Sequence, residues 1–321
     1  MRHVVIPDDY QQATRQLPFL FSTEGYSTEV IGDLSKAEHV DVTLSTAEAL
    51  ILIRERTVID TAFLRRTPQL KLISQTGKIA PHIDLDACTA AGVAVVEGVG
   101  SPIAPAELTW LLIMAAQRQL VPAVNAIAKG HWQVNIGRAV AGQSLGILGF
   151  GKIGKRIARY AQAFEMNVQV WGSARAQQEA REQGFDVPTS RAEFFATSDI
   201  LTVHQRLVPA TQGNITLHDL LTMKTSAMFV NTSRAELVAP EALIKALDAG
   251  TPGFAALDVF EQEPIYDPNH PLLQRTDVLC TPHLGYVEQA GYDLYIRTAF
   301  DNVVKFFTGE RSHVLNPEAL D

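Results

Sequence analysis

Short apolar runs alternate with amphipathic stretches along most of the chain. In the first hundred residues, the apolar runs that predict strands are His3–Ile6, Ala49–Ile53, Leu70–Ser74 and Val93–Val96. Amphipathic segments such as Val58–Arg66 and Leu85–Ala91 lie between them and predict helices. Because strands that alternate with helices pair in parallel and are covered on both faces, this pattern predicts a doubly wound α/β domain.

A second series of the same kind follows a proline-containing break at residues 101–105, after which a long apolar helix is expected from about Ala106. Its predicted strands are Leu145–Leu148, Val168–Trp171, Ile200–Val203, Ala227–Asn231, Ala255–Leu257 and Val278–Cys280. A last helix is expected over Val287–Thr308. We predict two doubly wound parallel-sheet domains. A Rossmann cofactor domain, residues 99–286, is inserted in a flavodoxin-like substrate domain made of residues 1–98 and 287–321.

Composition narrows the range of partners. The 321 residues include 27 Lys and Arg against 35 Asp and Glu, a formal net charge of −8, which disfavours nucleic acid as a partner. The apolar stretch Leu108–Ala116 is too short to span a membrane, and acidic residues near the N-terminus disfavour a signal peptide. The two cysteines form no C-x-x-C pair and are expected to be buried thiols. We expect a cytoplasmic protein with no membrane partner and no metal.

A glycine pattern opens the second series. Gly149, Gly151 and Gly154 form G-x-G-x-x-G between an apolar strand and a helical stretch over Lys155–Phe164. In this context the first glycine permits a tight turn, the second admits a pyrophosphate, and the third lets the helix pack on the strand. The pattern predicts a dinucleotide at the helix N-terminus, the alternative being a glycine-rich turn that binds nothing.

The next predicted strand bears on the choice between NAD and NADP. An acidic residue at its end would accept a hydrogen bond from the ribose 2′-hydroxyl of NAD, but Gly172 stands there. Ser173 and Arg175 follow and could donate to a 2′-phosphate. We expect NAD or NADP as cofactor and slightly favour NADP. The alternative is that Arg175 is a solvated residue at a helix start and that other contacts hold NAD.

Polar motifs follow three later strands, at Asn231–Arg234, Ala256–Pro264 and Cys280–Gly285. Since parallel strands end at one edge of a sheet, the three motifs can converge there. Reduction of a 2-keto acid needs an arginine for the carboxylate, a histidine for the proton and a carboxylate that orients the imidazole. Arg234, His283 and Glu263 suit these roles. Each taken alone could instead be a surface ion-pair member, a turn residue or a solvated acid.

These motifs, N-T-S-R, A-L-D-V-F-x-x-E-P and T-P-H-L-G behind G-x-G-x-x-G, resemble those of the D-isomer-specific 2-hydroxyacid dehydrogenase family. The resemblance implies two domains, an Arg–Glu–His trio on Arg234, Glu263 and His283, and a homodimer formed through the cofactor domains. Besides the glycines, Ser173 and Arg175, the cofactor contacts implied or expected are Lys152, Ile153, His204, Thr232, Ser233, Asp258 and Gly285.

The N-terminal half departs further from the family pattern. Where the family's substrate loop commonly reads G-x-G-x-D-x-I-D, this chain keeps Gly77 and Ile83–Asp84 but has Lys78 and other residues between them. Amides near Gly77 and Lys78 are still expected to hold a substrate carboxylate. Tyr286 replaces a usual small residue, and Tyr286, Tyr292 and Tyr295 are expected to wall the substrate pocket. Formate dehydrogenase relatives place Gln at the position of Glu263, which argues against formate.

Two functions stay open at this point. The first is an NAD(P)-dependent oxidoreductase that transfers a hydride between nicotinamide and a small 2-keto or 2-hydroxy acid, of the D-isomer by resemblance. The second is a non-catalytic NAD(P)-sensing binding protein on the same scaffold, because relatives of that kind can retain the Arg–Glu–His trio.

Overall fold

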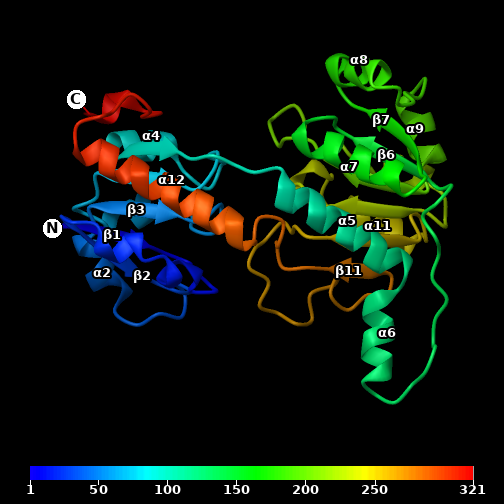
Figure 1. The fold of residues 1–321 in the computed structure, drawn as a ribbon, viewed down its shortest axis with the longest axis horizontal. Coiled ribbons are helices and arrows are strands. Elements are labelled where there is room, and N and C mark those ends of the chain that lie inside the picture. The colour runs from blue at the N-terminus through cyan, green and yellow to red at the C-terminus, as the bar shows by residue number, and fades with distance from the viewer. Residues whose placement is uncertain (321) are drawn as a thin grey trace. The chain divides into compact units, whose positions relative to one another are not determined.

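The computed structural model describes residues 1–320, which fold into two compact units (Figure 1). The first unit comprises Met1–Ser101 and the chain from Glu288 onwards, and the second comprises Pro102–Val287. The substrate role of residues 1–98 with 287–321 and the cofactor role of residues 99–286 stay predictions.

The first unit contains a five-stranded, all-parallel sheet with the strand order β2-β1-β3-β4-β5. Its strands are β1 (Arg2–Ile6), β2 (Tyr26–Val30), β3 (Ala49–Leu52), β4 (Leu72–Gln75) and β5 (Ala94–Glu97). This is the flavodoxin-like order, and it confirms the predicted class of this sheet. The order reverses between β1 and β3, so a ligand is expected outside the carboxyl ends of these strands.

Helices cover both faces of this sheet, because alternate strand residues point to opposite sides. Leu50, Leu52 and Ile73 pack under the first group of helices, α2 (Val40–Thr46), α3 (Thr61–Arg65) and α4 (Leu85–Ala90). Helix α12 (Gln289–Phe307) packs against β3 and β4 of this sheet. There the hydroxyl of Ser74 on β4 donates to the carbonyl of Ala299 on α12 at 2.8 Å. The remaining short helices are α1 (Phe19–Ser22) and the 3-10 turns Ala13–Gln16 and Pro317–Leu320.

The second unit contains a six-stranded parallel sheet in the order β11-β10-β9-β8-β6-β7. Its strands are β6 (Ser144–Leu148), β7 (Asn167–Trp171), β8 (Ile200–Val203), β9 (Met228–Asn231), β10 (Phe254–Leu257) and β11 (Val278–Cys280). Beyond β7 the chain at Asp186 forms one further parallel bridge, to Gln169. With this bridge counted, the sheet has the dinucleotide-binding order, whose reversal point lies between β6 and β8.

Two apolar layers enclose the second sheet. On one side Ile147, Val170 and Val230 pack with α5 (Ile103–Gln117) and α7 (Lys152–Ala163). On the other, Leu201 and Phe229 pack with α9 (Arg191–Thr197), α10 (Leu217–Thr222) and α11 (Ala242–Asp248). The elements α6 (Leu120–Ile127), α8 (Ala174–Glu182) and the 3-10 turn Ala235–Leu237 complete this unit. The doubly wound class predicted from the sequence is confirmed.

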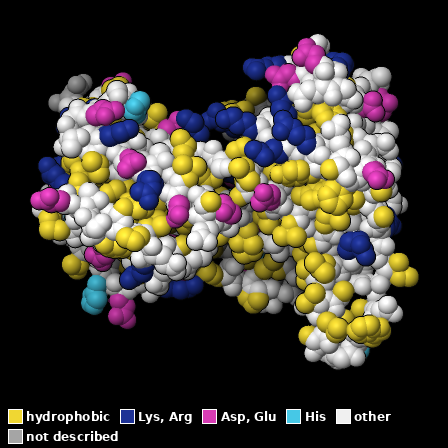
Figure 2. All heavy atoms as spheres, in the orientation of Figure 1, with side chains coloured by type: hydrophobic (Ala, Val, Ile, Leu, Met, Phe, Trp, Pro, Cys, Tyr) yellow, Lys and Arg dark blue, Asp and Glu magenta, His cyan; other side chains and the backbone are white. Residues whose placement is uncertain are grey.

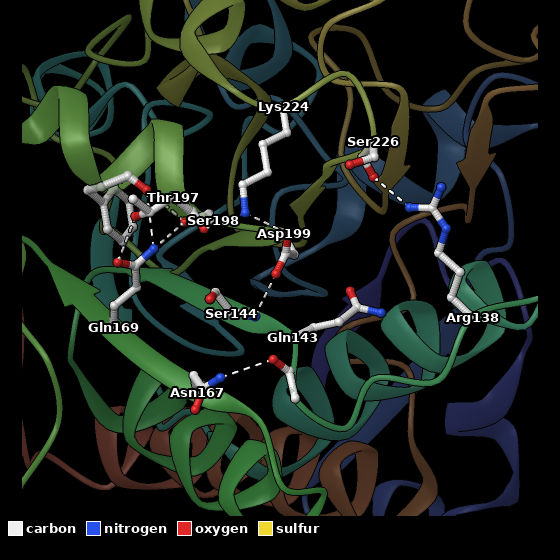
Figure 3. Close-up of polar contacts among 12 residues, drawn as sticks. Arg138, Gln143, Ser144, Asn167, Gln169, Thr197, Ser198, Asp199, Lys224 and Ser226 are labelled. Atoms are coloured by element: carbon white, nitrogen blue, oxygen red, sulfur yellow. Dashed lines mark hydrogen bonds and ion pairs between the residues drawn. The ribbon is translucent and has the colours of Figure 1, made fainter.

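Polar contacts fasten the amino-terminal edge of this sheet (Figure 3). Asp199, just before β8, accepts from the backbone N–H of Ser144 at 2.8 Å and from Lys224 Nζ at 2.7 Å. Asn167 Nδ2, at the start of β7, donates to the Gly142 carbonyl at 3.0 Å. The polar groups at this edge therefore hydrogen-bond to one another. A ligand is expected at the opposite, carboxyl-terminal edge of the sheet.

The structure adds one strand to the prediction and moves the start of one helix. Strand β2 was not predicted, because this edge strand alternates Tyr-Ser-Thr-Glu-Val and contains no apolar run. The long apolar helix α5 begins at Ile103 instead of Ala106, since Pro105 falls in its first turn, where the missing N–H costs no hydrogen bond. Neither α5 nor any other helix within residues 1–320 is both long and apolar enough to cross a membrane.

Candidate active site

The glycine loop after β6 closes tightly at two positions and stays open at one. Gly149 has φ +101°, and a Cβ there would lie 2.6 Å from the carbonyl oxygen of His204. A Cβ on Gly154 would lie 2.3 Å from the carbonyl oxygen of Gly149. A Cβ on Gly151, the residue that precedes α7, would meet nothing within 4 Å. The loop therefore has the shape that a pyrophosphate needs, a tight turn with one exposed backbone segment.

A cavity of about 600 Å³ opens over this loop. Lys152 begins α7 and lines the cavity, and Ile153 follows it, so the first backbone N–H groups of this 12-residue helix face the loop. Figure 2 shows Lys and Arg side chains gathered at this end of α7. Amide donors, a helix N-terminus and basic side chains together fit a dinucleotide pyrophosphate. The side chains that line the cavity include Lys152, Lys155, Ser173, Arg175, Glu179, His204 and Arg206.

On α8, which follows β7, the predicted ribose side of this cavity carries the carboxylate of Glu179, which the sequence analysis missed. Ser173 caps α8, where its hydroxyl accepts from the Ala176 N–H at 3.3 Å. Arg175 Nε contacts Glu179 Oε1 at 2.9 Å, and Lys155 Nζ contacts Glu179 Oε2 at 2.6 Å. The four-residue spacing of Arg175 and Glu179 was the available signal, because such pairs face each other on a helix.

His204 follows β8, across the reversal point of the sheet from the glycine loop. Its backbone N–H donates to the Leu148 carbonyl at 2.8 Å, and its Nε2 lies 3.0 Å from the Thr202 hydroxyl. Burial lowers the pKa of His204 to about 3, so the ring is neutral at physiological pH. Its place in the cavity wall suits a neutral hydrogen-bonding group beside a cofactor.

The three polar motifs follow three neighbouring strands. Leu257 of β10 pairs with Asn231 of β9 on one side and with Cys280 of β11 on the other, so the strands end level with one another. Arg234 lies three residues past β9, and its Nη1 donates to the Ser233 carbonyl at 2.7 Å. Asn231 braces this turn by donating to the Arg234 carbonyl at 2.9 Å. Parallel pairing thus brings the ends of the three motif-bearing strands to one edge.

His283 and Glu263 form a direct side-chain pair at this edge. His283 Nδ1 lies 2.6 Å from Glu263 Oε2, and the second carboxylate oxygen accepts from the Phe260 N–H at 2.8 Å. The side chains are 18% and 31% exposed, respectively. His283 has a left-handed backbone, φ 51°, and its ring lies edge-to-face 5.2 Å from that of Tyr286. The imidazole is oriented on one nitrogen by a fixed carboxylate and on one face by an aromatic ring.

Asp258 fixes the segment that carries His283. This carboxylate is fully buried and accepts from the Thr281 hydroxyl at 2.6 Å and from the N–H groups of Leu284 and Gly285 at 2.7 and 2.8 Å. Burial raises the pKa of Asp258, against the opposing effect of these hydrogen bonds.

Thr232, another predicted cofactor contact, lies with its hydroxyl 2.7 Å from that of Thr109 on α5. Ser233 donates to the Gln205 carbonyl at 2.7 Å.

The predicted substrate loop of the first unit is filled by the chain's own side chains. Gly77 has φ +143°, and a Cβ there would lie 2.2 Å from the guanidinium of Arg54. Lys78 Nζ forms an ion pair with Glu97, which also accepts from the Ile79 N–H at 3.1 Å. Neither Arg54 nor Glu97 was singled out in the sequence, because neither belongs to a motif. Two of the tyrosines expected to wall the pocket are engaged within this unit. The hydroxyl of Tyr292 accepts from Arg56 at 2.7 Å, and that of Tyr295 accepts from the Ser101 N–H at 3.1 Å.

A glycine-rich turn at the reversal point of a parallel sheet, with a His–Glu pair on neighbouring strand ends, defines a dinucleotide-dependent oxidoreductase. Residues 110–285 match the family model described as "D-isomer specific 2-hydroxyacid dehydrogenase, NAD binding domain". The chain therefore belongs to the D-isomer-specific 2-hydroxyacid dehydrogenase family and is an NAD(P)-dependent oxidoreductase.

Individual relatives agree with this assignment. The chain is 34% identical over 287 residues to glyoxylate reductase of Aeropyrum pernix, which covers 86% of this chain and 83% of that one. It is 33% identical over 260 residues to D-3-phosphoglycerate dehydrogenase of Methanocaldococcus jannaschii, covering 80% of this chain but only 49% of that relative. The crystal structure of a phosphoglycerate oxidoreductase from Vibrio cholerae O395 superposes with a TM-score of 0.91 at 47% identity, covering 96% and 99% of the two chains.

Proposed function

We propose that this protein reduces small 2-keto acids of the glyoxylate or hydroxypyruvate type to D-2-hydroxy acids, or catalyses the reverse oxidation. The contact that carries the proposal is the 2.6 Å pair between His283 Nδ1 and Glu263 Oε2. It supplies a proton donor held in one orientation at the sheet edge that also carries the glycine loop. The names of the relatives, glyoxylate reductase and D-3-phosphoglycerate dehydrogenase, support the substrate class.

The residues divide the chemistry among them. The bound nicotinamide supplies or accepts the hydride. Because Nδ1 of His283 is engaged by Glu263, its Nε2 gives the proton to the carbonyl oxygen of the keto acid and takes it back in the reverse direction. Arg234 binds the carboxylate and the neighbouring oxygen through its planar fork of N–H groups. Asp258 keeps the His283 segment in place through its three buried hydrogen bonds.

Replacement of His283 tests this proposal. His283→Ala should lower kcat by about 10²–10⁴-fold, because general acid–base catalysis contributes that much, and should leave dinucleotide affinity nearly unchanged. The matched control is His218→Ala, an exposed histidine on α10. The assay follows NADH and NADPH oxidation with a panel of 2-keto acids. Full kcat in His283→Ala, or dinucleotide binding without turnover of any acid by the wild type, would contradict the proposal. The second result would favour the non-catalytic sensor.

We propose further that the site accepts NADP(H) and slightly prefers it. The strand end at Gly172 carries no carboxylate, and Ser173 and Arg175 line the cavity beside it. Arg175→Ala should therefore weaken binding of NADPH more than binding of NADH, as measured by titration of each cofactor. Equal effects on the two cofactors would remove the role of Arg175 in phosphate binding.

We also propose a homodimer formed through the second unit. Helix α6 has no buried residue, and it exposes Val124 and Ile127 by 55% and 56% of their surface. Figure 2 shows apolar side chains gathered over this helix. Exposed apolar patches of this kind are typical of subunit interfaces. The double variant Val124→Glu/Ile127→Glu should shift the mass measured by light scattering from two chains to one, and an unchanged mass would exclude this surface.

The thiols fit the proposed cytoplasmic location. Cys88 and Cys280 are both free, and burial raises the pKa of each to about 11. Thiols of this kind stay protonated and unreactive at neutral pH. Both should resist alkylation by iodoacetamide in the folded protein at pH 8 and react once it is unfolded.

A further inference from the structure

Two cations of the proposed cofactor cavity share one carboxylate. Lys155, on the first turn of α7, and Arg175, on α8, both contact Glu179, at 2.6 and 2.9 Å. Their hydrogen bonds, first that of Lys155 and then that of Arg175, lower the pKa of Glu179, so this residue is ionised at neutral pH. The cluster of one anion and two cations carries a net single positive charge.

The cluster lies where the sheet presents the ribose end of a dinucleotide. Lys155, Arg175 and Glu179 line the same cavity as Gly149 and Gly151. In parallel sheets of this order, the end of the second strand, here β7, faces the adenine ribose. Lys155 and Glu179 are 30% and 26% exposed and belong to the cavity wall, whereas Arg175 is 88% exposed at its rim.

A ribose 2′-hydroxyl and a 2′-phosphate respond differently to this arrangement. The hydroxyl can donate to a carboxylate, whereas the phosphate is repelled by it and attracted by the two cations. A phosphate can use Lys155 and Arg175 fully only when Glu179 gives up at least one of them. NAD binding requires no such exchange.

We propose that Glu179 is a specificity-determining residue, which weakens NADP binding by occupying Lys155 and Arg175 and thereby keeps NAD competitive at this site. The inference rests on the proposed cofactor site, and it assigns to α8 a second control of cofactor choice besides the missing acid at Gly172. Glu179 is thus an internal competitor of the 2′-phosphate for the same two cations.

Binding of NADP⁺ and NAD⁺ to Glu179→Gln, measured by calorimetry without substrate, tests this inference. The glutamine keeps the shape of the side chain and removes its charge. NADP⁺ affinity should rise by about fivefold, because the variant removes one negative charge beside the partly exposed 2′-phosphate. NAD⁺, which has no phosphate there, should change in affinity by less than twofold. The matched control is Glu182→Gln, an exposed residue one turn further along α8 that accepts from Gln178. It should leave both affinities unchanged.

Lys155→Met provides a second, opposite test. This variant should weaken NADP⁺ several-fold and NAD⁺ little, with thermal unfolding confirming that it is folded. An unchanged NADP⁺/NAD⁺ affinity ratio in Glu179→Gln, or an equal change in Glu182→Gln, would overturn the inference while leaving the cofactor site intact. A wild-type protein that binds neither dinucleotide would instead overturn the proposed function itself, so the two failures are distinguishable.

Discussion

The glycine loop of the second unit and the glycine loop of the first unit both follow parallel strands, yet they are built in opposite ways. In the second unit, backbone atoms close the turn at Gly149, while Gly151 faces an open cavity. In the first unit, Gly77 is covered by the guanidinium of Arg54, and the amide of Ile79 is already bonded to Glu97. One loop presents its backbone to a ligand, and the other is occupied by the chain's own charges.

The two loops differ because binding a pyrophosphate and recognising one particular small acid make different demands on a loop. A pyrophosphate is the same in every dinucleotide, so its loop needs only a backbone shape that glycines specify. A substrate loop has to distinguish one small acid from another, and side chains from elsewhere in the fold do that. Variants of the two loops should therefore fail for different reasons, which the following predictions use.

The largest effect is expected at Gly149. In Gly149→Ala the new Cβ would meet the His204 carbonyl at 2.6 Å, and the residue would keep a φ of +101° that alanine rarely adopts. Because the obstacle is a backbone carbonyl that cannot rotate away, the unfolding free energy should fall by about 3 kcal/mol. Dinucleotide binding should be lost as well. The control is Gly151→Ala, which meets open space and should unfold normally in urea. Equal stability of the two variants would contradict the described turn.

A smaller effect is expected at Gly77, because its obstacle is a flexible side chain. Gly77→Ala should cost about 1–2 kcal/mol, mainly for the alanine backbone at φ +143°. In an Arg54→Ala background the steric part of this cost should disappear, so the double-mutant cycle should give a nonzero coupling energy in urea unfolding. Strict additivity would show that the Arg54 guanidinium does not cover this glycine.

The sequence predicts those features of the fold and site that local residue patterns determine, and it misses contacts between separate elements. The parallel sheets, the glycine turn and the arrival of three motif-bearing strands at one edge could be predicted, because local apolar runs and strand ends determine them. Strand β2 could not, since an edge strand needs no apolar run. The pairing of Glu97 with Lys78 and that of Glu179 with Lys155 could not either, because separate elements bring these partners together. Only the four-residue spacing of Arg175 and Glu179 was visible in the sequence.

The pH dependence of stability tests the surroundings of the glycine loop in the second unit, because His204 packs against Gly149. Its folded pKa of about 3 lies below the ordinary value of about 6.5, so below pH 6.5 the unfolded chain binds a proton that the folded protein does not. The unfolding free energy should therefore fall on acidification, by about 1 kcal/mol between pH 7.5 and pH 5.5 from this residue alone. His204→Asn should show a correspondingly flatter pH dependence in urea titrations. Parallel curves for the two proteins would mean that the ring is hydrated and protonates freely.

The smallest effect, and the one that bears most directly on the first loop, is expected at Glu97. Glu97→Gln keeps the hydrogen bond from the Ile79 N–H but removes the charge that pairs with Lys78, whose side chain is 69% exposed. An exposed pair of this kind contributes at most about 1 kcal/mol, so stability should hardly change. If the loop receives a substrate carboxylate, however, the uncompensated Lys78 should lower KM for 2-keto acids by about two- to threefold at low salt. Glu24→Gln, an exposed change of the same charge in the same unit, should leave KM unaltered. A KM that is equal in all three proteins would place substrate binding away from Lys78 and leave the occupied loop with a purely structural role.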